Sequence, residues 1–168
     1  EIKFMQPDLI IVMAYGKILP KKILEIPKNG CINIHVSLLP RWRGAAPIEH
    51  TLINGDKETG ISIIKLVEEL DAGPLITQEK IIIPNNINKL ELSDLLTNIG
   101  TKLLLNTLPK YLNNEIIPRE QDEVNITYAE KISNETRKIN FDNTTESVIN
   151  HIRAHSPKPG AWFYLNGK

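Results

Sequence analysis

The sequence predicts an α/β protein with a largely parallel β-sheet, and two kinds of segment point to it. The uninterrupted apolar run of residues 9–14 is typical of a strand covered on both faces of a parallel sheet, and residues 31–34 form a second, mainly apolar strand. Segments with helix start and stop signals lie between and after these runs. Strands that alternate with helices along the chain indicate a layered α/β domain.

The first segments read in the order strand, helix, strand. Residues 9–14 (LIIVMA) form the first expected strand. Residues 21–27 (KKILEIP) can make a short helix before the turn at Asn29 and Gly30. Residues 31–34 (CINI) then return as the second strand, so that the pattern of a strand–helix–strand unit is complete.

The middle of the chain continues this alternation. Residues 46–55 (APIEHTLING) carry a Pro near the first turn and a Gly at the end, as a short helix would, and residues 60–67 and 74–83 are strand-like. Asn88 and Glu91 have the spacing of a capping box at the start of the longest expected helix. Apolar residues recur at helical spacing behind it, at Leu92, Leu95, Leu96, Ile99 and Leu103.

The composition becomes more polar after Asn114. Short strands are expected at residues 126–131 and 138–141, and residues 144–154 can form an amphipathic helix that the Ser156-Pro157 pair ends. An Asn166-Gly167 pair near the last residue is a hairpin-turn signal. We therefore divide the chain into a catalytic domain (residues 1–114), a linker and subdomain connection (115–143) and the start of a C-terminal domain (144–168).

Composition excludes several classes of protein. The formal net charge of zero argues against a chain that coats nucleic acid and leaves room only for a local basic patch. A single Cys, Cys31, cannot form an internal disulfide, which favours a reducing, cytoplasmic setting. His151 and His155 have the spacing of a zinc pair but lack a third ligand, so we expect no metal. No apolar run approaches the ~20 residues of a membrane span.

Three polar residues are placed as the groups of an acyl-transfer site. Asn33 and His35 stand two apart at the end of the second strand, so both side chains point to the same side, and ligands bind outside the carboxyl ends of such strands. Asp71 lies in the loop after the third strand and can reach the same crevice. Asn can donate to an oxyanion, His can move a proton, and Asp can orient the His. Each motif taken alone is also compatible with an ordinary strand end or turn.

Two longer tracts of the sequence around these residues resemble a known protein family. Residues 33–48 (NIHVSLLPRWRGAAPI) and 55–76 (GDKETGISIIKLVEELDAGPLI) resemble the folate-dependent formyltransferases. Residues 37–48 are similar in particular to the members of that family that act on methionyl-tRNA, whereas members that act on glycinamide ribonucleotide lack the Arg-Gly-Ala-Ala-Pro run. Residues 126–133 (ITYAEKIS) and 152–163 (IRAHSPKPGAWF) are similar to the linker and second-domain entry of the same members.

The resemblance implies a Rossmann-like catalytic domain, then a linker and the start of an OB-like β-barrel. It implies formyl transfer from 10-formyltetrahydrofolate to the amine of methionine on initiator methionyl-tRNA, in translation initiation, by a monomer with no membrane partner. Its family pattern places the catalytic groups on Asn33, His35 and Asp71, with direct attack of the amine, oxyanion stabilisation by Asn33 and His35, and proton transfer assisted by Asp71. The folate-binding residues it implies are Tyr15, Gly16, Ile18, Leu19, Ser37, Leu38, Leu39 and Pro40, and those for tRNA are Arg41, Trp42 and Arg43.

Several alternatives stay open from the sequence. A related formyltransferase could act on glycinamide ribonucleotide or on the amine of a nucleotide sugar. A fragment of this kind could also bind tRNA or folate without catalysis. For Arg41, Trp42 and Arg43 the alternative to tRNA contact is a solvated loop with the Trp packed on the domain. The resemblance also leads us to expect earlier strands before Glu1 and most of a barrel after Lys168.

Overall fold

A four-stranded sheet is the central layer of the computed structural model, which describes residues 1–166. Its strand order is β1-β2-β4-β5, and β3 and β6 form a separate pair. The strands are β1 (Ile10–Val12), β2 (Cys31–His35), β3 (Arg43–Gly44), β4 (Glu58–Lys65), β5 (Leu75–Ile82) and β6 (Tyr128–Ala129). The α-helices are α1 (Ile2–Met5), α2 (Lys21–Leu24), α3 (Pro47–Ile53), α4 (Lys89–Leu112) and α5 (Thr145–Ala154), with 3-10 turns at Glu123–Asn125 and Glu135–Arg137.

The α/β class is confirmed, and the strand directions add detail to it. β1 and β2 run parallel, as predicted, whereas β4 is antiparallel to both β2 and β5. An uninterrupted apolar run shows that both faces of a strand are covered but does not fix its direction. The direction of β5 follows from its short connection to β4, residues 66–74, which needs no crossover helix.

The elements expected from the sequence are present, with one exception among the described residues. Residues 138–141 form no strand, and Lys138 makes only an isolated bridge to Trp162. The strand expected at 126–131 is the two-residue β6, which pairs with β3. The Asn166-Gly167 turn lies partly outside the described residues, and the OB-like barrel stays a prediction.

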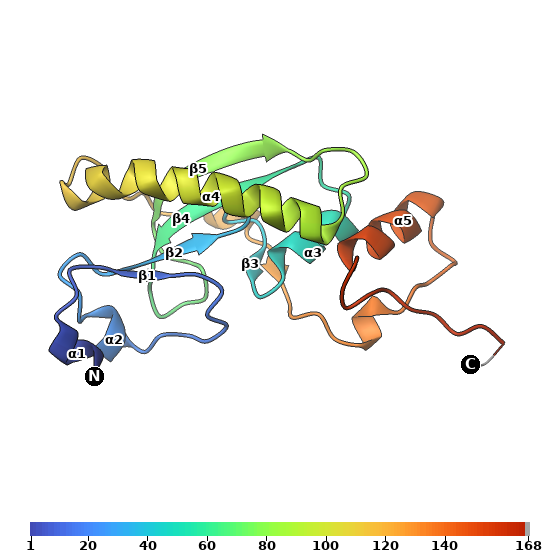
Figure 1. Cartoon of the computed structure of the whole chain (residues 1–168), viewed down its shortest axis with the longest axis horizontal. Helices are drawn as coiled ribbons and strands as arrows, with labels where there is room; N and C mark the ends of the chain where they lie inside the picture. Colours follow the sequence, from blue (N-terminus) through green and yellow to red (C-terminus); the bar gives the residue numbers. More distant parts are fainter. Residues whose placement is uncertain (167–168) are drawn as a thin grey trace.

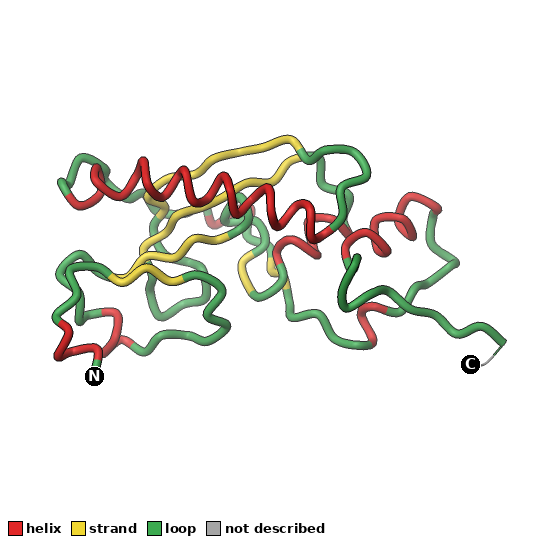
Figure 2. Tube along the Cα trace, in the orientation of Figure 1, coloured by secondary structure: helices red, strands yellow, loops and turns green. Residues whose placement is uncertain are grey.

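One long helix covers one face of the sheet. In Figures 1 and 2, α4 lies across the strands from the β5 end toward the β1 side. Its N-cap is the predicted capping box, in which the Asn88 side chain accepts from the Glu91 N–H and Glu91 accepts from the Asn88 N–H. The core beneath it is a continuous cluster of buried apolar side chains, among them Ile32, Ile34, Leu52, Ile61, Ile63, Leu92 and Leu96.

The C-terminal helix packs against the same core. α5 lies beside α3 at one end of the molecule (Figure 1), and its Ala154 belongs to the main cluster of buried residues. Arg153 donates from Nη1 to the backbone oxygen of Ile87 just before α4, over 3.3 Å. Over residues 1–166, none of the helices is both long and apolar enough to cross a membrane.

Candidate active site

The strand β2 delivers two polar side chains to one edge of the sheet. Asn33 and His35 alternate with Ile32 and Ile34, whose apolar side chains join the core. Val12 of β1 is in register with Asn33, so the ends of the two parallel strands meet here. β2 is therefore a strand with apolar side chains on one side, and its other side carries an amide and an imidazole near the carboxyl end.

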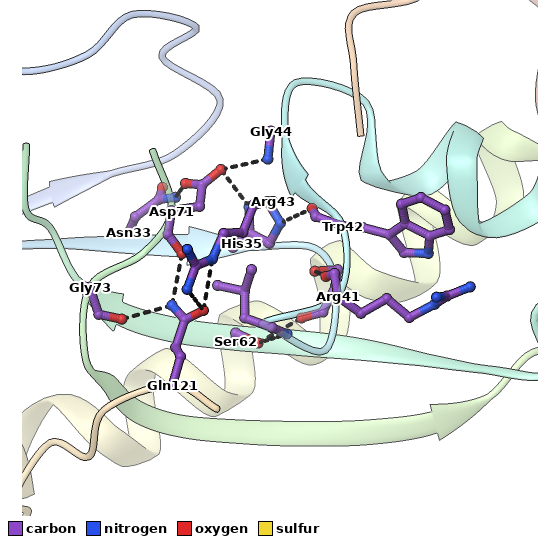
Figure 3. A network of polar contacts seen from close by, with 12 residues as sticks. Asn33, His35, Arg41, Trp42, Arg43, Gly44, Ser62, Asp71, Gly73 and Gln121 are labelled. Atoms are coloured by element: carbon purple, nitrogen blue, oxygen red, sulfur yellow. Dashed lines mark hydrogen bonds and ion pairs between the residues drawn. The ribbon is translucent and has the colours of Figure 1, made fainter. Parts of the chain in front are cut away.

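Asp71 arrives at the same place from the loop between β4 and β5. Its backbone adopts the left-handed conformation, with a φ of 48°. Asn33 donates from Nδ2 to its Oδ1 over 3.4 Å, and the backbone N–H of Gly44 donates to its Oδ2 over 2.9 Å. His35 Nδ1 lies 3.6 Å from the same Oδ2. Figure 3 shows these groups converging on the carboxylate, as the sequence predicted for the trio.

The hydrogen bonds of His35 define its tautomer. Its Nε2 lies 2.9 Å from the backbone oxygen of Trp42, which can only accept, so Nε2 carries the hydrogen. The imidazole is only 5% exposed, and this burial lowers its pKa, although the negative charge of Asp71 acts in the opposite direction. At neutral pH the ring is therefore uncharged, and Nδ1 faces the Asp71 carboxylate with a free lone pair.

A cavity of about 530 Å³ opens beside these groups. Cavities of roughly 300–1,000 Å³ are usual for small-molecule sites. The segment after β1 forms one wall, and all four of its predicted residues line the cavity, namely Tyr15, Gly16, Ile18 and Leu19. Asn33, His35 and Asp71 line the same cavity, so an apolar ring bound in it would lie beside the polar trio.

The other four predicted folate residues do not line this cavity, and their contact with folate stays a prediction. Ser37, Leu38, Leu39 and Pro40 are absent from the cavity wall. Ser37 is fully buried and donates from Oγ to the Arg41 oxygen, while the Leu39 side chain packs in a small apolar cluster with Ile64 and Leu75. The turn after β2 therefore carries these residues away from the lining of the cavity.

The predicted tRNA residues are largely held inside the protein. Arg43 is 3% exposed and Trp42 8%, so neither presents its side chain to a large partner. Trp42 donates from Nε1 to Asp56 over 2.8 Å, and Arg41 makes a two-point contact with the same carboxylate at 2.9 and 2.7 Å. Arg41 also stacks over the Trp42 ring at 4.3 Å. The burial of Trp42 agrees with the packed Trp of the alternative weighed from the sequence, and contact of these residues with tRNA stays a prediction.

Two further residues of the site had no clear signal in the sequence. Gly44 supplies a backbone N–H to Asp71, which a side-chain pattern does not reveal. Gln121 comes from the polar segment after α4, and its amide contacts both the Asp71 loop and Arg43. Within residues 1–166, no three His, Cys, Asp or Glu side chains are grouped so that they could hold a metal ion.

Comparisons with known proteins identify the family to which the chain is similar. The family described as formyl transferase matches residues 1–108, and the formyl transferase C-terminal domain matches residues 131–168. Eight curated relatives, 42–47% identical, are named methionyl-tRNA formyltransferase. That of Syntrophomonas wolfei is 46% identical over 168 residues, which are 99% of this chain and 54% of the relative. The chain thus spans about half the length of the curated relatives it matches.

Solved structures share the fold. HypX from Aquifex aeolicus, in complex with tetrahydrofolic acid, has a TM-score of 0.83 at 21% identity, over 96% of this chain and 28% of that one. An N-formyltransferase from Helicobacter canadensis, in complex with folinic acid and dTDP-3-aminofucose, has a TM-score of 0.78 at 24% identity, over 90% and 56% of the two chains. At these identities the likeness concerns the Rossmann-like formyltransferase fold alone.

Proposed function

The chain belongs to the formyl transferase family, and we propose that it carries the catalytic centre of a methionyl-tRNA formyltransferase. The proposed reaction moves a formyl group from 10-formyltetrahydrofolate to the α-amine of methionine on initiator tRNA. The single observation that carries this proposal is the convergence of Asn33, His35 and Asp71 in the lining of the cavity. The name shared by the curated relatives supports the choice of substrate.

The reaction needs one new bond and one broken bond. The amine nitrogen attacks the formyl carbon, and the carbonyl oxygen becomes negatively charged. The bond from that carbon to N10 of the folate then breaks, and the proton lost by the amine balances the proton gained at N10. Asn33 has one amide N–H on Asp71 and a second N–H free to donate, so we assign the developing oxyanion to it.

His35 and Asp71 are assigned to the proton. Because Nε2 is committed to the Trp42 oxygen, the atom that can accept a proton is Nδ1. A proton on Nδ1 would lie between the imidazole and the Asp71 carboxylate 3.6 Å away, which stabilises the charged ring. An uncharged His35 thus takes the amine proton at Nδ1. Donation from Nδ1 to the oxyanion would need the ring to be protonated first.

The formyl donor is assigned to the cavity and the tRNA to its mouth. Tyr15, Gly16, Ile18 and Leu19 would enclose the pterin ring, since apolar walls with few polar groups suit a flat heterocycle. Of the three residues predicted for tRNA, we retain only Arg41, whose side chain is partly exposed. The proposed place of action is the cytoplasm, where initiator tRNA is charged, and the proposed state is a monomer.

The domain division is also proposed. Residues 1–114 would hold the catalytic domain, 115–143 the connection, and 144–168 the start of the C-terminal domain. The matches of two formyl transferase families to residues 1–108 and 131–168 support a division of this kind.

The test of the proposal is the variant Asn33→Ala in the full-length protein. Loss of one oxyanion donor costs roughly 2.7–4 kcal/mol in the transition state, so we expect kcat for formylation of initiator methionyl-tRNA to fall by about 10²–10³. Asn29→Ala is the matched control, because Asn29 lies before β2 and bonds Asp8 far from the cavity. Turnover by Asn33→Ala equal to that of Asn29→Ala would remove the oxyanion role.

The same assay separates the alternative substrates. Glycinamide ribonucleotide and a dTDP-amino sugar replace the charged tRNA in two parallel reactions with the wild-type protein. Faster formylation of either small amine would replace the proposed substrate. Binding of folate with no turnover on any amine would favour a non-catalytic binding protein.

A further inference from the structure

We infer that Gln121 is a positioning residue for the proposed reaction, in which its buried side-chain amide holds the Asp71 loop against β3. Gln121 lies 50 positions after Asp71 in the sequence, in the polar connection beyond α4. It is 8% exposed, and every polar atom of its side chain has a partner within the site. The inference rests on the proposed function and names a residue that the reaction depends on without touching substrate.

The nitrogen of the amide binds two carbonyl oxygens of the Asp71 loop. Gln121 Nε2 donates to the backbone oxygen of Asp71 over 2.7 Å and to that of Gly73 over 2.8 Å. Asp71 has a positive φ, a conformation that costs free energy for a residue with a side chain. Two hydrogen bonds to the carbonyls on either side of Ala72 therefore stabilise the turn that points the carboxylate at Asn33 and His35.

The oxygen of the same amide holds the other wall of the site. Gln121 Oε1 accepts from Arg43 Nε over 3.1 Å and from Arg43 Nη2 over 2.9 Å. Arg43 is followed by Gly44, whose N–H donates to the Asp71 carboxylate. One side chain thus connects the backbone of the Asp71 loop with the strand that holds the Asp71 side chain, as Figure 3 shows.

An amide is suited to this place because it offers donors and an acceptor together. Both loop partners are carbonyl oxygens, which need N–H donors, and Arg43 needs an acceptor. Glu at position 121 would keep the acceptor but lose both donors and would face two carbonyl oxygens with a negative charge. Met has a similar length and would leave both sets of partners unpaired in a buried place.

Displacement of the Asp71 carboxylate would change the pKa of His35 even in the absence of substrate. The charge of Asp71 raises the pKa of His35 against the larger effect of burial. Movement of the carboxylate away from Nδ1 therefore lowers the His35 pKa further and changes the nitrogen chemical shifts of the ring. This effect is measured without substrate, so it is independent of which amine is formylated.

The experiment compares Gln121→Met and Gln121→Glu with Gln78→Met in the full-length protein. Gln78 is a matched control because its Nε2 also makes two hydrogen bonds, to Leu39 O and Ser62 Oγ, both at 2.8 Å and outside the cavity wall. We expect both Gln121 variants to lose about 10- to 100-fold in kcat, since small misplacements of a catalytic group cost up to 10²-fold. The KM for the formyl donor should change little. The His35 nitrogen signals should shift in Gln121→Met and stay unchanged in Gln78→Met.

The outcomes separate the two proposals. Wild-type kcat and His35 signals in both Gln121 variants would overturn the positioning role, and so would equal losses in Gln78→Met. Shifted His35 signals in Gln121→Met, in a protein whose wild type formylates no amine, would support the positioning role and reject the proposed function. If Gln121→Met does not fold, Gln121→Glu, which keeps the acceptor for Arg43, decides the matter through the same two measurements.

Discussion

Gly44 is a residue of the site at which a single added methyl group is expected to have a large effect. Its φ is +122°, and a Cβ there would lie 2.6 Å from the backbone oxygen of Ala129 in β6. Gly44→Ala must therefore push β3 away from β6 and move the N–H that donates to Asp71. We expect a loss of about 1–3 kcal/mol in the free energy of unfolding, from strain and overpacking, and at least a tenfold lower kcat.

The comparison for Gly44→Ala is Gly160→Ala, measured by urea unfolding and by the formylation assay. Gly160 also has a positive φ, +88°, but an added Cβ would meet nothing within 4 Å. This control carries the backbone strain without the clash and lies outside the cavity wall. Equal stability and equal turnover in the two variants would mean that the fit of β3 against β6 does not matter to the site.

His155 predicts how stability depends on pH. The ring is fully buried, and neither of its nitrogens has a hydrogen-bond partner among the described residues. Burial lowers the pKa of His155 from 6.5 to about 4. The nearby charged and titratable groups are His151, Glu49, Arg137 and Lys89, of which only Glu49 favours the charged ring. In the unfolded chain the ring gains a proton below an ordinary pKa of about 6.5.

The sign of the effect follows from these two pKa values. Between pH 6.5 and 4 the unfolded chain binds the His155 proton and the folded chain does not, so the free energy of unfolding falls as the pH falls. The contribution is present in full above pH 6.5 and is lost toward pH 4, at about 1.4 kcal/mol per unit of pKa difference. The loss attributable to this one residue is therefore at most roughly 3.5 kcal/mol.

His155→Leu tests this dependence by urea unfolding at pH 7 and pH 4.5. We expect the variant to lose less stability between the two pH values than the wild type, because it has no ring to protonate. His50→Gln is the control, since it removes a His whose Nε2 is paired with the Glu130 oxygen. An acid-induced loss in His155→Leu as large as in His50→Gln would assign the acid sensitivity to other groups.

The residues of the site differ in how far sequence could predict them. Strand alternation predicted that Asn33 and His35 share one side, and the resemblance to the formyltransferases implied the catalytic roles of these two residues and of Asp71. Arg43 was predicted to contact tRNA because an Arg in an expected loop reads as exposed, whereas the structure buries its side chain against Gln121 and pairs it with the exposed Glu69. Gln121 was missed because a single polar residue in a polar segment carries no periodic signal.

Among the elements, α4 was the most predictable because its signals are local. Its capping box depends on two residues three positions apart and on no tertiary contact. The antiparallel direction of β4 depends on which strand it meets, which is a long-range property that an apolar run does not encode. The missing strand at residues 138–141 has the same cause, because Lys138 meets Trp162 through one bridge only.

The capping box gives a quantitative prediction for α4. Asn88→Ala removes the acceptor of the Glu91 N–H and should lower the free energy of unfolding by about 1 kcal/mol. Asn98→Ala is the control, because Asn98 is exposed in the interior of the same helix and Ala there favours the helix slightly. Urea unfolding of both variants checks this, and equal midpoints would show that the cap contributes nothing measurable.

In the whole molecule, α5 connects the proposed C-terminal segment with the catalytic domain. The division proposed from sequence begins a C-terminal segment at residue 144, yet α5 packs against α3 and places Ala154 in the core. A helix that shares a core with a domain loses its burial when that domain opens, so the two should unfold together. We therefore expect α5 to unfold with the catalytic domain, although it begins the proposed C-terminal segment.

Ala154→Glu tests the shared unit, with Ile149→Glu as its match. Both variants place one carboxylate on α5, but Ala154 is buried in the core while Ile149 is half exposed. A charge buried without a partner costs several kcal/mol, so Ala154→Glu should speed hydrogen exchange of the α3 amides, measured by mass spectrometry, by a factor that Ile149→Glu does not approach. Unchanged exchange of α3 in Ala154→Glu would mean that α5 detaches by itself, and that the catalytic core is stable without it.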